Sequence, residues 1–124
     1  MMKARISETE WKVMEVVWDE SPLYSKEILK RLADTGWSEG TIKTLINRLV
    51  GKKAIGYKKE GKSYNYYPLV MKKQCIQAES RHFINKIFNG SRKEFLAAFV
   101  RDEKLTPQEI DELRTLLDKK ESEQ

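Results

Sequence analysis

The first fifty residues carry apolar side chains at intervals of three or four positions, in three separate segments. These segments span residues 8–19, 26–34 and 39–51, and their spacing predicts three short amphipathic helices. Residues 54–60 and 63–69 instead alternate polar with apolar or aromatic side chains, and a glycine-containing turn separates them. The alternation predicts a two-stranded hairpin, so the expected fold is mainly α with a small β-hairpin wing.

Residues that favour helix N-termini precede each helical segment. Ser7 and Glu10 have the spacing of a capping box, Ser25 precedes the second helix, and Ser38 precedes the third. A threonine–glycine pair at positions 35–36 supplies a tight turn between the second and third helices. Two helices joined by such a turn form a helix-turn-helix, in which the third helix is the recognition helix.

The third helix has an apolar stripe and a separate polar face. At 100° per residue, one stripe holds Ile42, Leu45, Ile46 and Leu49. The opposite face holds glycines, which allow close approach, together with side chains suited to reading a DNA groove. An amide can bond adenine bidentately, and an arginine can bond guanine or phosphate. A merely solvated helix face is the alternative interpretation.

We expect DNA contacts from this face and from the hairpin. The hairpin lysines should touch phosphates rather than base edges, because flexible point charges position a protein without reading sequence. The expected DNA-binding residues are Ser38, Gly40, Thr41, Lys43, Thr44, Asn47 and Arg48 from the helix, with Lys58, Lys59, Lys62 and Ser63 from the wing.

Charge is concentrated in the same region. The 124 residues have a net charge of +5, yet the run from Lys43 to Lys62 contains seven basic residues and one acid. A concentrated basic patch attracts phosphate, which favours nucleic acid over a protein-interaction adaptor that uses the winged fold without DNA. Tyr64, Tyr66 and Tyr67 leave single-strand or RNA binding open as an alternative, although alternation places at least one of them in the core.

Several classes of protein and site are not indicated. One cysteine, Cys75, and one histidine, His82, can form neither an internal disulfide nor a closed structural metal site, and no cofactor is expected. No nucleophile-elbow, phosphate-loop or metal-protease spacing occurs, so we expect no enzyme. The chain shows no secretion signal and no apolar run of membrane-spanning length, so we expect a cytoplasmic protein.

Residues 71–124 change in character and predict three further helices, so we expect a DNA-binding domain over 1–70 and a dimerisation region over 71–124. The helices cover about 71–88, a segment starting at Ser91, and a segment opened by Thr106. Their apolar stripes do not form an obvious closed core, so we expect a homodimer; folding back onto the first domain is the alternative. The expected dimerisation residues are Ile76, Phe83, Ile84, Ile87, Phe95, Phe99, Ile110, Leu113 and Leu117.

Three segments carry a family resemblance. They read ISETEWKVMEVVWDESP, WSEGTIKTLINRLVGKKAIGYKKEGKSYNYYPLV and EFLAAFVRDEKLTPQEIDELRTLLDKK. In order and spacing they resemble the penicillinase and methicillin-resistance repressor family, which also includes copper-transport repressors. The resemblance implies a homodimeric repressor that binds palindromic operators upstream of resistance or transport genes, with a winged helix-turn-helix followed by a helical dimerisation region.

The resemblance also implies a route of induction. In the penicillinase branch a membrane sensor-protease leads to cleavage of the repressor between asparagine and phenylalanine. The matching segment here is Ala97-Ala98-Phe99-Val100, so Ala98 and Phe99 flank the possible proteolytic site, with alanine in place of the asparagine. The copper branch carries Cys-x-Cys motifs near its C-terminus, and this chain has none, so copper sensing by that route is not expected.

Overall fold

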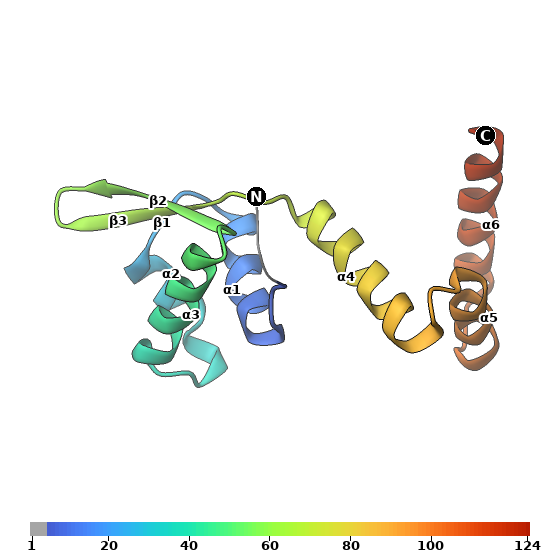
Figure 1. Ribbon diagram of the computed structural model, residues 1–124, viewed down its shortest axis with the longest axis horizontal. Helices are drawn as coiled ribbons and strands as arrows, with labels where there is room; N and C mark the ends of the chain where they lie inside the picture. Colours follow the sequence, from blue (N-terminus) through green and yellow to red (C-terminus); the bar gives the residue numbers. More distant parts are fainter. Residues whose placement is uncertain (1–4) are drawn as a thin grey trace. The chain divides into compact units, whose positions relative to one another are not determined.

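The computed structural model describes residues 5–124 and divides the chain into two compact units, the first ending at Glu79 and the second running from Ser80 to Gln124. The first unit begins with α1 (Glu8–Asp19), β1 (Leu23–Tyr24), α2 (Ser25–Arg31) and a 3₁₀ turn, η1 (Ala33–Thr35). It continues with α3 (Glu39–Gly51), β2 (Ile55–Glu60) and β3 (Ser63–Pro68) (Figure 1). The helix α4 (Lys72–Phe88) runs through the boundary, and α5 (Arg92–Asp102) and α6 (Pro107–Ser122) belong to the second unit.

The predicted capping residues start α1 and α3. The Ser7 hydroxyl accepts a hydrogen bond from the Glu10 amide at 3.2 Å, and the Glu10 carboxylate accepts one from the Ser7 amide at 2.8 Å. Ser38 Oγ likewise accepts from the Thr41 amide at 3.1 Å. These side chains satisfy amides that have no partner within the first turn, so the predicted starts of both helices are confirmed.

The second helix differs from its prediction at both ends. Ser25 is the first residue of α2, not its cap, and the amide of Tyr24 donates to Glu27 Oε1 at 2.9 Å. The helix ends at Arg31, not near residue 34, because the chain tightens into η1. There the amide and the hydroxyl of Thr35 both donate to the Leu32 carbonyl oxygen, at 3.1 and 2.7 Å, which favours a 3₁₀ turn.

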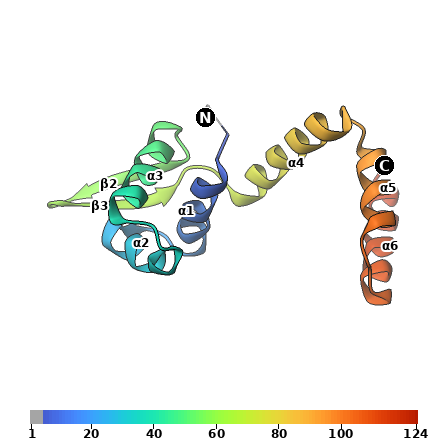
Figure 2. The same cartoon turned by 90° about the horizontal axis from the view of Figure 1, so that it is seen from below.

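The sheet has three strands where two were predicted. Its order is β1-β3-β2, with β3 antiparallel to both neighbours, and Tyr66 lies opposite Leu23 of β1 and Tyr57 of β2. The strand β1 contains two residues, which is too short for alternation to be visible in the sequence. The β2–β3 hairpin projects beyond the helices of the first unit as a protruding wing (Figures 1 and 2).

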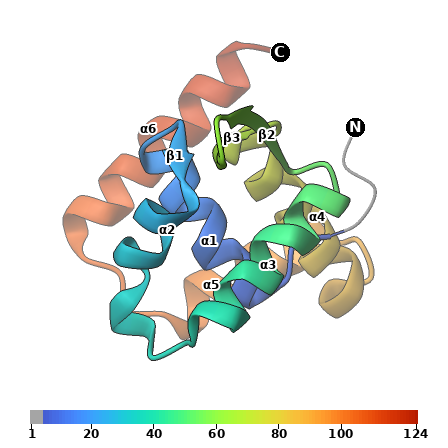
Figure 3. The ribbon, with the colours of Figure 1, turned by 90° about the vertical axis from the view of Figure 1, so that its left-hand side faces the viewer.

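The hydrophobic core of the first unit lies among α1, α2, α3 and the base of the sheet. Figure 3 shows α1, α2 and α3 crossing one another, with the hairpin beginning at the C-terminal end of α3. All four residues of the predicted α3 stripe are buried, as are Leu23, Ile28 and Ile55. Cys75 of α4 is also buried in this core, so the first unit extends beyond the boundary expected at residue 70.

The second unit is built around an aromatic cluster. Phe83, Phe88, Phe95 and Phe99 form successive ring pairs with centroids 5.6 to 6.4 Å apart. None of residues 80–124 is buried, because three short helices cannot enclose these side chains. The second unit therefore leaves a broad apolar surface exposed.

Candidate nucleic-acid interface

The polar face of α3 is exposed along its whole length. Lys43, Asn47 and Arg48 are exposed, whereas Ile42 and Ile46 on the opposite side are almost fully buried. The Thr44 hydroxyl donates to the Gly40 carbonyl oxygen at 2.9 Å, and the Thr41 and Ser38 hydroxyls lie 3.0 Å apart. These hydroxyls are engaged within the helix, so Lys43, Asn47 and Arg48 offer the longer donors and acceptors of this face.

The two glycines of this face are not required by packing inside the protein. A Cβ atom built at Gly51 meets nothing within 4 Å, and one at Gly40 meets only Ser38 Oγ at 3.8 Å. Gly56 in β2 is different, since a Cβ there would lie 2.8 Å from the Tyr67 ring. The absence of a side chain at Gly40 and Gly51 therefore leaves the helix backbone open to an approaching surface.

The wing presents two chemically different faces. Side chains alternate along a strand, so the pairs Tyr57–Tyr66 and Lys59–Tyr64 share one face of the hairpin. Lys58 lies opposite Asn65 and points to the other face. The predicted DNA-contacting residues of the wing are all exposed: Lys58, Lys59, Lys62 and Ser63. They do not lie on a single face of the hairpin.

The tyrosine-bearing face of the wing lies against α3 across a hollow. One part of this hollow is lined by Asn47, Val50, Tyr57, Tyr64 and Tyr66, and an adjoining part by Ser25, Lys43, Ile46, Asn47, Tyr64 and Tyr66. Tyr66 is 9% exposed, which confirms that at least one wing tyrosine belongs to the core. Sequence reasoning did not select Ser25 or Tyr57 as site residues and considered Tyr64 only for single-strand or RNA binding, although the strand register would have placed both tyrosines on one face.

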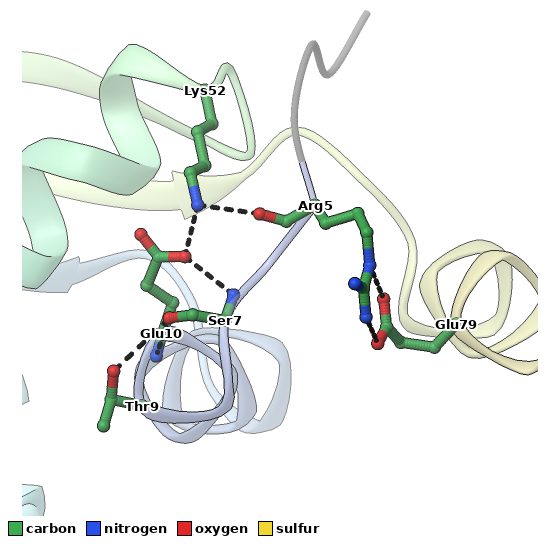
Figure 4. A network of polar contacts seen from close by, with 6 residues as sticks. All are labelled: Arg5, Ser7, Thr9, Glu10, Lys52 and Glu79. Atoms are coloured by element: carbon green, nitrogen blue, oxygen red, sulfur yellow. Dashed lines mark hydrogen bonds and ion pairs between the residues drawn. The ribbon is translucent and has the colours of Figure 1, made fainter. Parts of the chain in front are cut away.

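Lys52 belongs to the basic run of the sequence but serves to hold α3 in place. Its ammonium group forms an ion pair with Glu10 Oε1 of α1 and donates to the Arg5 carbonyl oxygen at 2.7 Å (Figure 4). The side chain of Arg5 in turn pairs with Glu79 of α4. Six basic residues of the run therefore remain for the predicted phosphate surface, and Lys52 holds the C-terminal end of α3 against α1.

The surroundings of Glu10 explain its charge. Desolvation of this buried carboxyl raises its pKa, but hydrogen bonds from Lys52 and from the amide and hydroxyl of Ser7 outweigh that effect and leave the pKa below its ordinary value. Glu10 is therefore a buried carboxylate at neutral pH. The capping-box spacing predicted its contact with Ser7, whereas the partner 42 residues away in sequence gave no signal.

Comparison with known proteins decides the family. A model of the penicillinase repressor family matches residues 6–119. The chain belongs to the penicillinase repressor family.

Relatives and a solved structure agree with this assignment to the penicillinase repressor family. The chain is 34% identical over 115 residues to the penicillinase repressor of Bacillus licheniformis, a match that covers 92% of this chain and 90% of that one. It is 38% identical over 116 residues to the methicillin resistance regulatory protein MecI of Mammaliicoccus sciuri, covering 93% and 94%. The solution structure of monomeric Bacillus licheniformis BlaI in complex with the blaP half-operator matches with a TM-score of 0.51 and 37% identity, covering 59% of this chain and 92% of that chain.

The dimerisation residues predicted for this penicillinase-repressor chain lie on α4, α5 and α6. Ile84 and Phe95 are partly buried, and the other members of the set are exposed: Ile76, Phe83, Ile87, Phe99, Ile110, Leu113 and Leu117. The structure brings the phenylalanines together and leaves the leucine and isoleucine edges of α6 uncovered within the described chain. Ala98 and Phe99, the possible proteolytic site, lie inside α5.

Two further observations bear on possible ligands and on the membrane. Among residues 5–124, no group of three or more histidine, cysteine, aspartate or glutamate side chains is arranged to hold a metal ion. Within the same residues, no helix combines the length and apolar character needed to span a bilayer.

Proposed function

We propose that this chain is a sequence-specific double-stranded DNA-binding transcriptional repressor that acts as a homodimer on a palindromic operator. The genes under its control serve β-lactam resistance or transport, and it works in the cytoplasm without a cofactor or a catalytic step. The observation that carries the proposal is the exposed polar face of α3, within a chain similar in sequence and structure to monomeric BlaI solved in complex with a half-operator.

Specificity and affinity are divided between α3 and the wing. Asn47 and Arg48 supply base contacts, whose loss costs about 1–3 kcal/mol at one base position. Lys58, Lys59 and Lys62 supply phosphate contacts, each of which steepens the dependence of log affinity on log salt by about one unit. Lys58 and Lys59 point to opposite faces of the wing, and both fit this role because phosphates lie along the whole DNA backbone and can be contacted from either face.

The experiment that tests this division is a salt titration of operator and random-duplex binding. We expect Asn47→Ala and Arg48→Ala to narrow the gap between operator and random duplex, and the wing lysine variants to weaken both and flatten the salt slope. Lys119→Ala, which removes one positive charge outside α3 and the wing, serves as the control. If Asn47→Ala and Arg48→Ala bind every duplex as the unaltered protein does, α3 is not the reading element.

The second unit joins two copies of the chain. Its exposed apolar side chains need a covering surface, and a second copy supplies an identical set across a two-fold axis. Dimerisation also serves the proposed function, because one small winged domain contacts too few base pairs for useful specificity. The proposed trigger of operator release is cleavage within α5 that depends on a membrane sensor-protease, because cutting there weakens the dimer.

A further inference from the structure

The hollow between α3 and the wing is lined by polar and aromatic side chains together with the aliphatic Ile46 and Val50, and none of its described lining residues is a carboxylate. Ser25 of α2 and Lys43 and Asn47 of α3 line one side, and Tyr57, Tyr64 and Tyr66 line the other. Lys59 is paired with Tyr64 across the strands and therefore adds a second cation to the same face of the wing. A ligand in this hollow meets hydroxyls, an amide and positive charge, which together favour an anion.

The tyrosine side of the hollow consists of three aromatic rings that contact one another. The rings of Tyr57 and Tyr64 meet edge to face with centroids 5.1 Å apart, and Tyr66 lies 6.3 and 6.5 Å from them. Tyr57 and Tyr64 are nevertheless 51% and 41% exposed, so ring surface remains open to solvent. The Tyr66 hydroxyl is protonated at neutral pH, as an ordinary tyrosine is, and burial raises its pKa further.

The hollow lies where a DNA backbone would pass if α3 entered the major groove. A recognition helix in the major groove and a wing beside it lie on two sides of one DNA strand. The sugar-phosphate ridge of that strand must then pass through the space between α3 and the wing. In this protein that space is the hollow, so under the proposed function the side chains lining it face the ridge.

We propose that the α3–wing hollow is a seat for one sugar-phosphate unit of the operator strand, with the phosphate bound by Lys43, Ser25 and the Tyr64 hydroxyl and the deoxyribose packed on the tyrosine rings. The inference rests on the proposed function and deepens it by naming a backbone subsite and the residues that form it. Since Asn47 lines the same hollow, a phosphate seated there also fixes the register in which Asn47 meets the bases.

Tyr64→Phe is the informative variant because it removes the hydroxyl and keeps the ring. Tyr67→Phe is a matched control: Tyr67 lies on the same strand, is 39% exposed, and points to the opposite face, where its ring packs over Gly56. We expect Tyr64→Phe to lower affinity for operator and random duplex alike by about tenfold, the scale of a hydrogen bond to a charged group. Tyr67→Phe should bind both as the unaltered chain does.

A phosphate scan of the operator locates the seat. Operators in which one phosphate at a time is replaced by a neutral methylphosphonate are titrated with the full-length protein, with Tyr64→Phe and with Lys43→Met. Replacing one particular phosphate per half-site should weaken binding of the unaltered protein about tenfold. The same replacement should weaken either variant less, because each variant has already lost one of the contacts to that phosphate. Equal losses for all three proteins at every phosphate would overturn the seat.

Two other outcomes have distinct meanings. Tighter binding to single-stranded oligonucleotides than to duplex, lost in Tyr57→Ala and Tyr64→Ala, would overturn the seat in favour of base stacking on the tyrosines. If the unaltered protein binds no duplex above the random level, the proposed function fails. If the protein binds operator normally but Tyr64 shows no coupling to any phosphate, the proposed seat is wrong and the proposed function stands.

Discussion

At the scale of single residues, the ion pair between Glu10 and Lys52 holds the C-terminal end of α3 against α1. Glu10 is 2% exposed, and its carboxylate joins α1 to the residue that caps the C-terminal end of α3. A buried charge without its partner is costly, because the desolvation remains while the attraction is lost. The position of the face that we propose reads DNA therefore depends on an ion pair between α1 and the end of α3.

Lys52→Met should lower the free energy of unfolding by about 3 kcal/mol at neutral pH. In the unaltered protein the pKa of Glu10 is lowered, so the stabilisation is present above the ordinary carboxyl pKa and is lost as pH falls through the lowered value. In Lys52→Met, burial without the lysine raises the pKa of Glu10, and protonation relieves the penalty. The difference in stability between the two proteins should therefore shrink in acid.

Chemical denaturation at several pH values measures this difference. Lys53→Met is the matched control, because Lys53 is the exposed neighbour. A stability deficit in Lys52→Met that is independent of pH, or an equal deficit in Lys53→Met, would contradict the assigned role of the buried pair.

Sequence reasoning at this scale succeeded for contacts within one turn of helix. Ser7 with Glu10, and Ser38 with the amide of Thr41, follow from a fixed spacing of three residues. It failed for Lys52, which was grouped with the phosphate-binding charges, because its ion pair depends on how α1 packs against α3. A local pattern cannot report a contact that only the tertiary fold creates.

At the scale of elements, α1, α3 and the hairpin were predicted correctly within one residue, since each has a clear period and a cap or turn. The strand β1 and the early end of α2 were missed. The first is too short to show a period, and the second depends on the Thr35 bonds to Leu32. The hollow between α3 and the wing was also missed, because it exists only once β2 and β3 are placed against the helix.

Substitution by alanine should have opposite effects on stability at Gly40 of α3 and at Gly56 of β2. Gly40→Ala should stabilise the free protein by up to about 1 kcal/mol, because alanine is the better helix former and the added methyl has room. It should still weaken operator binding if DNA approaches that stretch of backbone. Gly56→Ala should destabilise the protein, because its methyl would lie within 3 Å of the Tyr67 ring.

Thermal unfolding and operator titration of both variants separate the two effects. A Gly40→Ala protein that is more stable and binds operator as tightly as the unaltered chain would show that DNA does not approach α3 at Gly40. Loss of stability in that variant would instead contradict the packing argument.

At the scale of the whole molecule, the chain contains a closed unit and an open one. The first unit has a buried core that includes Cys75 of α4, whereas residues 80–124 contain no buried residue. The helical pattern predicted α4, α5 and α6 but placed the boundary at residue 70, because the sequence gives no sign that α4 begins inside the first core. Assembly as a homodimer remains our proposal.

Induction by cleavage is a prediction about the same open unit. We expect membranes carrying the cognate sensor and inducer to cut the chain between Ala98 and Phe99, with loss of dimerisation and release from DNA. Both residues are helical, so α5 must open locally before the bond can enter a protease. Mass analysis of the fragments identifies the bond, with Ala98→Asn as a variant that restores the family residue. Inducer-dependent release of an intact chain would eliminate cleavage.

The most direct test of a dimeric operator-binding repressor is selection from a random pool of duplexes by the full-length protein, with salt titrated. We expect enrichment of a palindrome whose half-sites face one side of the duplex about one turn, or 34 Å, apart, and affinity that falls steeply with salt. A chain ending at Glu79 should enrich a single half-site more weakly. If the full-length protein selects no common sequence, the account is wrong. The account is also wrong if the full-length protein selects a single half-site and binds it no more tightly than the shortened chain does.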